Sequence, residues 1–155
     1  MICIDTMVLI WGVQKKARSG QEEMVERTAR YLRSLQDENE TIMVPAPAAA
    51  EYLQWFDDNE RQEQLAALER FFFVPSFDLP AAMVAAELSH RSEAWGFDER
   101  VDRQKVKTDV QIIAIAIAHR AELIVTDNVK EFRAIASGRI AVKEVPSVAE
   151  QRGLF

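Results

Sequence analysis

The chain has 155 residues, of which 48% are hydrophobic and 28% charged, as is usual for a folded domain with a sizeable core. Its apolar runs are too short for a transmembrane helix, and its first residues lack the basic start of a signal peptide. The single cysteine, Cys3, excludes an internal disulfide and is typical of a reducing compartment, so we expect a cytoplasmic protein. The net charge of −6 argues against a broad basic surface for nucleic acid, although bound metal would offset part of it.

Strands and helices alternate along the chain. Short apolar runs predict strands at residues 1–5, 41–44, 72–74, 123–125 and 140–142. Apolar residues at helical spacing predict helices at 6–17, 20–37, 47–56, 59–71, 80–95, 109–119 and 129–136. No internal repeat or Gly/Ser linker interrupts them, so we expect one domain over residues 1–155. The alternation predicts an α/β fold, a three-layer, doubly wound sheet of about five mainly parallel strands with helices on both faces.

Acidic or amide side chains follow strands or begin helices at four widely separated places. Asp5 ends the first strand, and Asp127 and Asn128 follow the strand at 123–125. Glu51 lies on the helix after the second strand, and Asp109 begins the apolar helix that leads to the fourth. Because parallel strands present their carboxyl ends at one edge of the sheet, we expect these side chains to converge there.

Each position taken alone has a simpler explanation. Asp5 can cap the following helix, Asp109 can interact with a helix dipole, and Asp127 with Asn128 can form a turn. Glu51 can be an exposed residue on an Ala-rich helix. Their combination instead favours a site for Mg²⁺ or Mn²⁺, because converging carboxylates repel one another and a hard cation relieves that repulsion. Such an ion polarises a phosphodiester and activates water for in-line attack, so the sequence predicts metal-dependent chemistry on phosphates.

The order of these motifs resembles a known family. Asp5-Thr6 comes first, Glu51 follows Val44-Pro45-Ala46-Pro47, and the segments 107–114 and 123–132 surround the later polar positions. The chain is similar over essentially its whole length to PIN domains, and among them to the small bacterial VapC-type toxins. The resemblance implies a Mg²⁺- or Mn²⁺-dependent endoribonuclease that cuts RNA, is often a homodimer, and is often inhibited by a small antitoxin encoded beside it.

The resemblance and the expected convergence together give three metal ligands. Asp5 and Asp109 are expected to bind the ion, and Glu51 to complete the acidic pocket directly or through water. Thr6, Lys107 and Thr126 are candidates for positioning the substrate, with Lys107 either contacting an RNA phosphate or simply solvated.

The chain departs from the family pattern at the last site residue. That residue usually comes two places after the threonine, where this chain has Asn128, while Asp127 supplies a carboxylate one place early. Neighbouring residues of a strand point to opposite sides, so Thr126 and Asn128 would share a face. We therefore expect Asn128 in the pocket and Asp127 as the cap of a helix beginning near Val129. A turn directly after Thr126 would instead leave Asp127 as the fourth acid.

Basic residues form two local clusters. For Lys15, Lys16 and Arg18, we expect a solvated helix face balanced by nearby acids. The second cluster, which leads into Asp109, contains Arg100, Arg103, Lys105 and Lys107.

Two further functions remain open from the sequence. Asn128 in place of an acid is compatible with a non-catalytic or RNA-binding PIN-like module. A haloacid-dehalogenase-like phosphotransferase also begins with an apolar strand and an aspartate, but its second aspartate would fall where this chain has Met7. The large aromatic residues fit either the core or a dimer interface.

Overall fold

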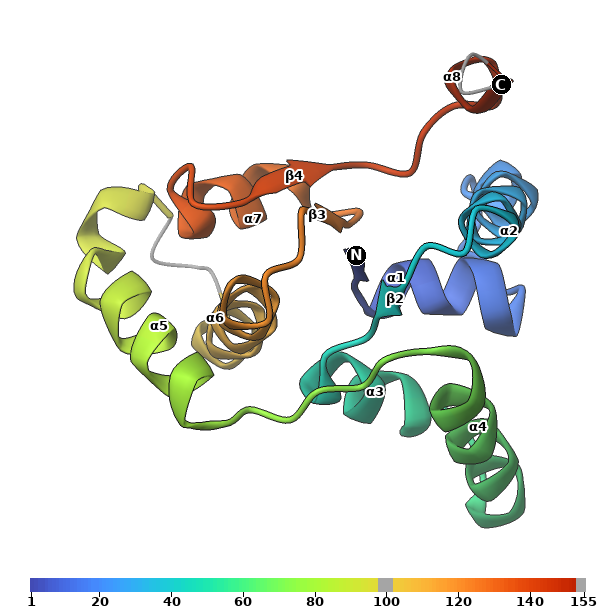
Figure 1. Cartoon of the computed structure of the whole chain (residues 1–155), viewed down its shortest axis with the longest axis horizontal. Coiled ribbons are helices and arrows are strands. Elements are labelled where there is room, and N and C mark those ends of the chain that lie inside the picture. Colours follow the sequence, from blue (N-terminus) through green and yellow to red (C-terminus); the bar gives the residue numbers. More distant parts are fainter. Residues whose placement is uncertain (98–101, 153–155) are drawn as a thin grey trace.

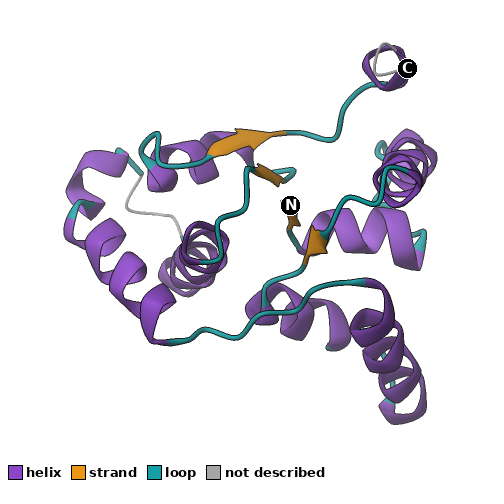
Figure 2. Cartoon of the chain, viewed as in Figure 1, coloured by secondary structure: helices purple, strands orange, loops and turns teal. Residues whose placement is uncertain are grey.

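A computed structural model describes residues 1–97 and 102–152, so Arg100 of the second basic cluster lies outside the described residues. Short strands lie at the centre and helices surround them (Figure 2). The strands are β1 (Ile2–Ile4), β2 (Ile42–Met43), β3 (Leu123–Val125) and β4 (Ala141–Lys143). The α-helices are α1 (Thr6–Leu9), α2 (Glu22–Asp37), α3 (Ala46–Leu53), α4 (Asp58–Phe71), α5 (Leu79–His90), α6 (Arg103–Ala118), α7 (Val129–Ala136) and α8 (Val148–Arg152). A π-helical turn, η1 (Ile10–Gln14), continues α1, and a 3₁₀ turn, η2 (Ser92–Trp95), follows α5.

The strands form one parallel sheet in the order β2-β1-β3-β4. The chain moves from β1 to β2 on one side and then returns across β1 to β3 on the other, so the strand order reverses between β1 and β3. Right-handed crossovers then place α2 on one face and α6 and α7 on the other, as Figure 1 shows. The predicted doubly wound α/β fold is confirmed, and its switch point lies at the carboxyl ends of β1 and β3.

The predicted fifth strand reduces to a single bridge. Phe73 pairs in parallel with Met43, and two backbone hydrogen bonds of 2.8 and 2.9 Å join this segment to β2. Pro75 follows two residues later and has no N–H to donate, so the ladder does not extend. The described residues therefore contain four strands where the sequence predicted about five.

Several helix boundaries also differ from prediction; the helix predicted at 80–95, for example, ends at His90, and a 3₁₀ turn follows it. The first helix ends at Gln14 and not at residue 17, because Lys15 adopts a left-handed conformation with φ 57°. Helix α6 begins at Arg103, six residues before the predicted start, with Asp102 capping it. Asp109 consequently lies inside the helix and not in its first turn.

The π-helical turn packs unusually closely on α2. A Cβ atom added to Gly12 would lie 2.5 Å from Leu32 Cδ1 and 2.9 Å from Thr28 Cγ2. Both neighbours are buried, so only glycine permits this contact. The close packing fixes α1, and with it the segment directly after Asp5.

The unpredicted helix α8 is bound to α2 by side chains. Arg27 donates to the carbonyls of Val145 and Pro146, and Gln151 donates back to the Arg27 carbonyl. Figure 1 accordingly shows α8 beside α2. No helix in the described part of the chain has both the length and the apolar character needed to cross a membrane.

Candidate functional site at the sheet switch point

Asp5 lies at the carboxyl end of β1, where its backbone N–H donates to the Val125 carbonyl of β3 at 3.3 Å. Its Oδ1 accepts from the Val8 N–H at 3.4 Å and so caps α1. Its Oδ2 accepts a hydrogen bond from the Thr126 hydroxyl. Burial raises the pKa of this carboxyl to about 6, against the opposing effect of the Thr126 hydrogen bond.

Thr126 supports the Asp5 carboxylate by a buried hydrogen bond. Its side chain is 0% exposed, and its hydroxyl also accepts from the Asn128 N–H at 3.0 Å. A fully buried hydroxyl cannot contact a bound substrate in this arrangement. The structure therefore places Thr126 as the support of a carboxylate.

Asp109 is the most perturbed acid of the site. It is only 7% exposed, and its buried Oδ2 has no hydrogen-bond partner among the described residues. Burial raises its pKa to about 7; the Lys105 charge opposes this, while the charges of Asp5, Glu51 and Glu131 add to it. An unpartnered buried carboxylate oxygen is costly unless a cation binds it.

Glu51 reaches the same edge of the sheet from α3. Its Oε2 accepts a hydrogen bond from the Thr6 hydroxyl at 2.6 Å. Thr6 directly follows Asp5, so this contact joins the start of α1 to α3. The charges of Asp5 and Glu51 both act on Asp109, so the three carboxylates lie near the same edge of the sheet.

The chain bends directly after Thr126, as the second of our two expectations required. Asn128 occupies the N-cap position of α7 with φ −96° and ψ 52°, so the prediction that Asp127 caps this helix is wrong. The chain has already left the strand conformation there, which removes the basis for simple alternation. Asp127 is exposed, yet its charge still acts on Asp5. Asn128 is half-buried and its amide donates to Glu131.

Glu131 is the site residue that the sequence analysis missed. It lies on the first turn of α7, is half-buried, and its charge acts on Asp109. The available signal was its spacing of three residues after Asn128, the spacing of paired side chains at a helix start. Glu131 therefore adds a carboxylate where Asn128 lacks one.

The two lysines before Asp109 lie on different sides of α6. Lys105 is one helical turn before Asp109 and acts on its charge. Lys107 lines a cavity of about 280 Å³ between α5 and α6, together with Phe77 and Trp95. The lysine adjacent to the acidic site is thus Lys105.

The donor set fits a hard divalent cation in its chemistry. Three carboxylates, those of Asp5, Glu51 and Glu131, act electrostatically on a fourth, Asp109, whose buried Oδ2 has no hydrogen-bond partner among the described residues. Hard divalent cations prefer such oxygen ligands. With the side chains as they lie, no three His, Cys, Asp or Glu residues of the described ranges are arranged to hold a metal ion. Rotation of Glu51 away from Thr6 or of Glu131 away from Asn128 would free further ligand oxygens.

Comparison with known proteins gives a family and two similar folds. The chain is similar to a VapBC2 structure from Rickettsia felis bound to a promoter DNA fragment, with 21% identity, TM-score 0.66, and coverage of 93% of this chain and 98% of the other. It is also similar to a DNA-bound VapBC structure from Salmonella typhimurium, with 18% identity, TM-score 0.65, and coverage of 94% and 98%. No curated protein matches the chain. The family model of the PIN domain matches residues 2–138, so the chain belongs to the PIN domain family.

Proposed function

We propose that the protein is an endoribonuclease dependent on Mg²⁺ or Mn²⁺ and acts as the toxin of a toxin–antitoxin pair. The observation that carries this proposal is the unpartnered, buried Oδ2 of Asp109 among further carboxylates at the switch point. Membership in the PIN family supports it. Asn128 does not argue for a non-catalytic module, because Glu131 restores the missing charge.

Each residue of the site has a defined task in this proposal. Asp5, Asp109 and Glu51 would hold the ion, which when bound polarises the phosphodiester and activates a water molecule. Thr126 keeps the Asp5 carboxylate in place, and Thr6 does the same for Glu51. These supporting bonds limit the reorganisation that the acids require during the reaction.

The test is cleavage of RNA by the purified protein. We expect cleavage with Mn²⁺ that EDTA abolishes, and no cleavage by Asp5→Asn or Asp109→Asn, because each variant loses a ligand charge. Asp37→Asn changes an exposed acid at the end of α2 and should cleave normally. Wild-type rates in Asp109→Asn would falsify the assignment.

A small antitoxin protein is the proposed partner. The two similar solved structures are VapBC complexes, which supports a protein partner for this chain as well. We expect a short reading frame beside this gene whose product copurifies with the chain and suppresses its RNA cleavage. Full cleavage in the presence of a bound product of that gene would contradict the toxin role.

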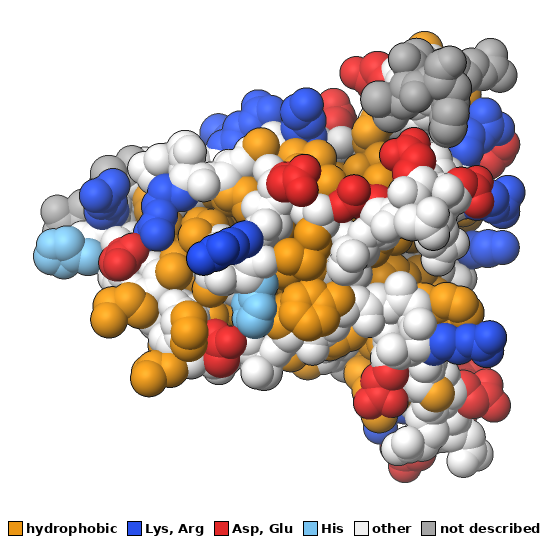
Figure 3. All heavy atoms as spheres, viewed as in Figure 1, with side chains coloured by type: hydrophobic (Ala, Val, Ile, Leu, Met, Phe, Trp, Pro, Cys, Tyr) orange, Lys and Arg blue, Asp and Glu red, His pale blue; other side chains and the backbone are white. Residues whose placement is uncertain are grey.

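A second copy of the chain is the other proposed partner. Leu79 and Met83 lie one turn apart on α5 and are 83% and 65% exposed, and Phe77 adjoins them at 39%. Figure 3 shows hydrophobic side chains gathered over α5. Exposed apolar side chains of this size mark interfaces. Light scattering should give a dimer for the wild type and a monomer for Met83→Asp, whereas an unchanged mass would exclude this surface.

A further inference from the structure

Trp55 is an exposed aromatic side chain just after α3, the helix that carries Glu51. It is 63% exposed, although a tryptophan normally buries most of its surface. It follows Glu51 by four residues and lies in the turn that ends α3, two residues beyond Leu53. The indole ring is therefore presented to solvent at the end of the helix that supplies one of the carboxylates.

Trp55 forms one wall of a groove beside α1. Met7 and Ile10 line it from α1 and η1, and its volume is about 210 Å³. Met7 directly follows Thr6, which is hydrogen-bonded to Glu51. One wall of the groove therefore belongs to the helix that begins after Asp5, and the other follows the helix that carries Glu51.

Two cations line the same groove, Lys16 and Arg18. The sequence suggested a solvated helix face here, but the helix ends at Gln14, and the backbone of Lys15 adopts a left-handed conformation. The Lys16 N–H then donates to the Ile10 carbonyl at 3.2 Å, which folds the following segment back beside the groove. Both cationic side chains are exposed, and neither forms an ion pair within the described ranges.

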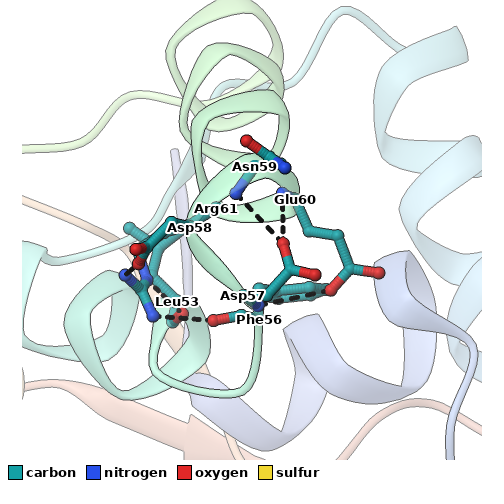
Figure 4. A network of polar contacts seen from close by, with 7 residues as sticks. All are labelled: Leu53, Phe56, Asp57, Asp58, Asn59, Glu60 and Arg61. Atoms are coloured by element: carbon teal, nitrogen blue, oxygen red, sulfur yellow. Dashed lines mark hydrogen bonds and ion pairs between the residues drawn. The ribbon is translucent and has the colours of Figure 1, made fainter.

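The turn that carries Trp55 is held rigidly by Arg61. The guanidinium donates to the Leu53 carbonyl at 3.2 Å and to the Phe56 carbonyl at 2.7 Å, on the two sides of Trp55 (Figure 4). The Phe56 ring packs edge-on against Tyr52 with centroids 5.1 Å apart. The backbone on both sides of Trp55 is thus held in place, so little backbone conformational entropy would be lost when a ligand stacks on the ring.

We propose that this groove binds single-stranded RNA next to the cleaved phosphate, with one base stacked on Trp55 and neighbouring phosphates at Lys16 and Arg18. This inference rests on the proposed ribonuclease function. An indole face accepts any base, and cations complement phosphates, so the groove joins the two contacts that single strands require. Its walls belong to the two segments that carry Asp5 and Glu51, which favours the substrate over a separate protein ligand.

The test measures binding of a labelled, mixed-sequence RNA of about 12 nucleotides by fluorescence anisotropy in EDTA, where the RNA stays intact. Trp55→Ala should weaken binding by about 5- to 150-fold, the range for loss of one stacked base, whereas Trp55→Phe should retain most of the affinity. Lys16→Gln and Arg18→Gln should each reduce the slope of log affinity against log salt by about 0.7. Leu65→Ala and Lys143→Gln change an exposed apolar and an exposed basic residue elsewhere and should have no effect.

The outcomes separate this inference from the proposed function. Unchanged RNA affinity in Trp55→Ala, in a protein that cleaves RNA with Mn²⁺, overturns the subsite alone. If Trp55→Ala keeps its RNA affinity but no longer binds the antitoxin, the groove belongs to a peptide partner instead. Binding that depends on Trp55 in a protein that never cleaves RNA supports the subsite and contradicts the ribonuclease. Absence of RNA binding by the wild type overturns the subsite.

Discussion

The carboxyl of Asp109 should make the stability of the metal-free protein depend on pH. Burial raises its pKa from 3.8 to about 7. Between these values the folded chain retains a proton that the unfolded chain has released, so a rise in pH favours unfolding. The raised pKa of Asp5, about 6, likewise makes the folded protein less stable as the pH rises to about 6. The free energy of unfolding in EDTA should therefore fall from about pH 4 to pH 7 and level off above.

Urea denaturation at a series of pH values measures this dependence. Asp109→Asn removes the titrating group and the repulsion by Asp5, so its stability should fall less over the same pH interval. Asp37→Asn, at an exposed position, serves as the control. Parallel curves for the wild type and Asp109→Asn would show that Asp109 titrates normally.

The two acids around Asn128 should behave differently on substitution. Asp127 is exposed and caps nothing, so Asp127→Ala should change stability by less than about 0.5 kcal/mol, compared with about 1 kcal/mol for a lost cap. Glu131→Gln removes a charge that acts on Asp109 and should weaken Mn²⁺ binding, as titration calorimetry would show. The assignment fails if Asp127→Ala abolishes cleavage while Glu131→Gln retains it.

The sequence indicated most of the acids that the structure places at this edge of the sheet. Asp5, Glu51 and Asp109 could be predicted because strand ends and helix starts of a doubly wound fold share one edge. Glu131 was missed because its one signal, a spacing of three residues after Asn128, is weak, and an acid in the first turn of a helix is common. The orientation of Asp127 also depended on where the chain leaves β3, and local alternation does not determine that point.

At the scale of elements, the contact between η1 and α2 depends on Gly12. Alanine is the better helix former by about 1 kcal/mol, but its Cβ would lie 2.5 Å from Leu32 Cδ1 in a buried contact. Overpacking of this kind costs about 1 to 3 kcal/mol, so we expect Gly12→Ala to destabilise the protein in urea denaturation.

A double-mutant cycle provides the control for Gly12→Ala. Leu32→Ala creates space at the contact and should cost about 2 to 5 kcal/mol alone. The double variant should then be more stable than the sum of the two costs implies, because the added methyl fills part of that space. Strict additivity would mean that the two residues do not compete for volume.

The elements themselves were predicted to different degrees. The strand at 123–125 and the helix at 129–136 have the predicted bounds, because apolar runs and turn residues delimit them. The start of α6 was missed because its first residues, 103–108, are mostly polar and so lack the helical spacing of apolar residues on which the prediction depended. The segment around Phe73 is apolar enough for a strand, but Pro75 limits its pairing. Strand pairing depends on tertiary contacts, so it cannot be derived from a single apolar segment of the sequence.

For the whole molecule, a bound metal should stabilise the fold. The carboxylates that repel one another belong to α3, α6, α7 and the end of β1, so relief of that repulsion acts on every layer. If the ion binds only the folded chain, a hundredfold excess over the dissociation constant should add about 2.7 kcal/mol. Thermal melts in Mn²⁺ and in EDTA at equal ionic strength measure this, and identical melts would exclude a carboxylate metal site.

The hydrogen bond from Thr126 to Asp5 joins residues 121 positions apart in the chain. β1 is a central strand, and one of its two partners, β3, is synthesised about 120 residues after it. The N-terminal part of a growing chain therefore has no partner for one edge of its first strand, and loop closure on this scale is slow. A chain that ends before residue 126 lacks Thr126, so its Asp5 carboxylate has neither the hydrogen bond nor the neighbouring strand that hold it in the folded protein.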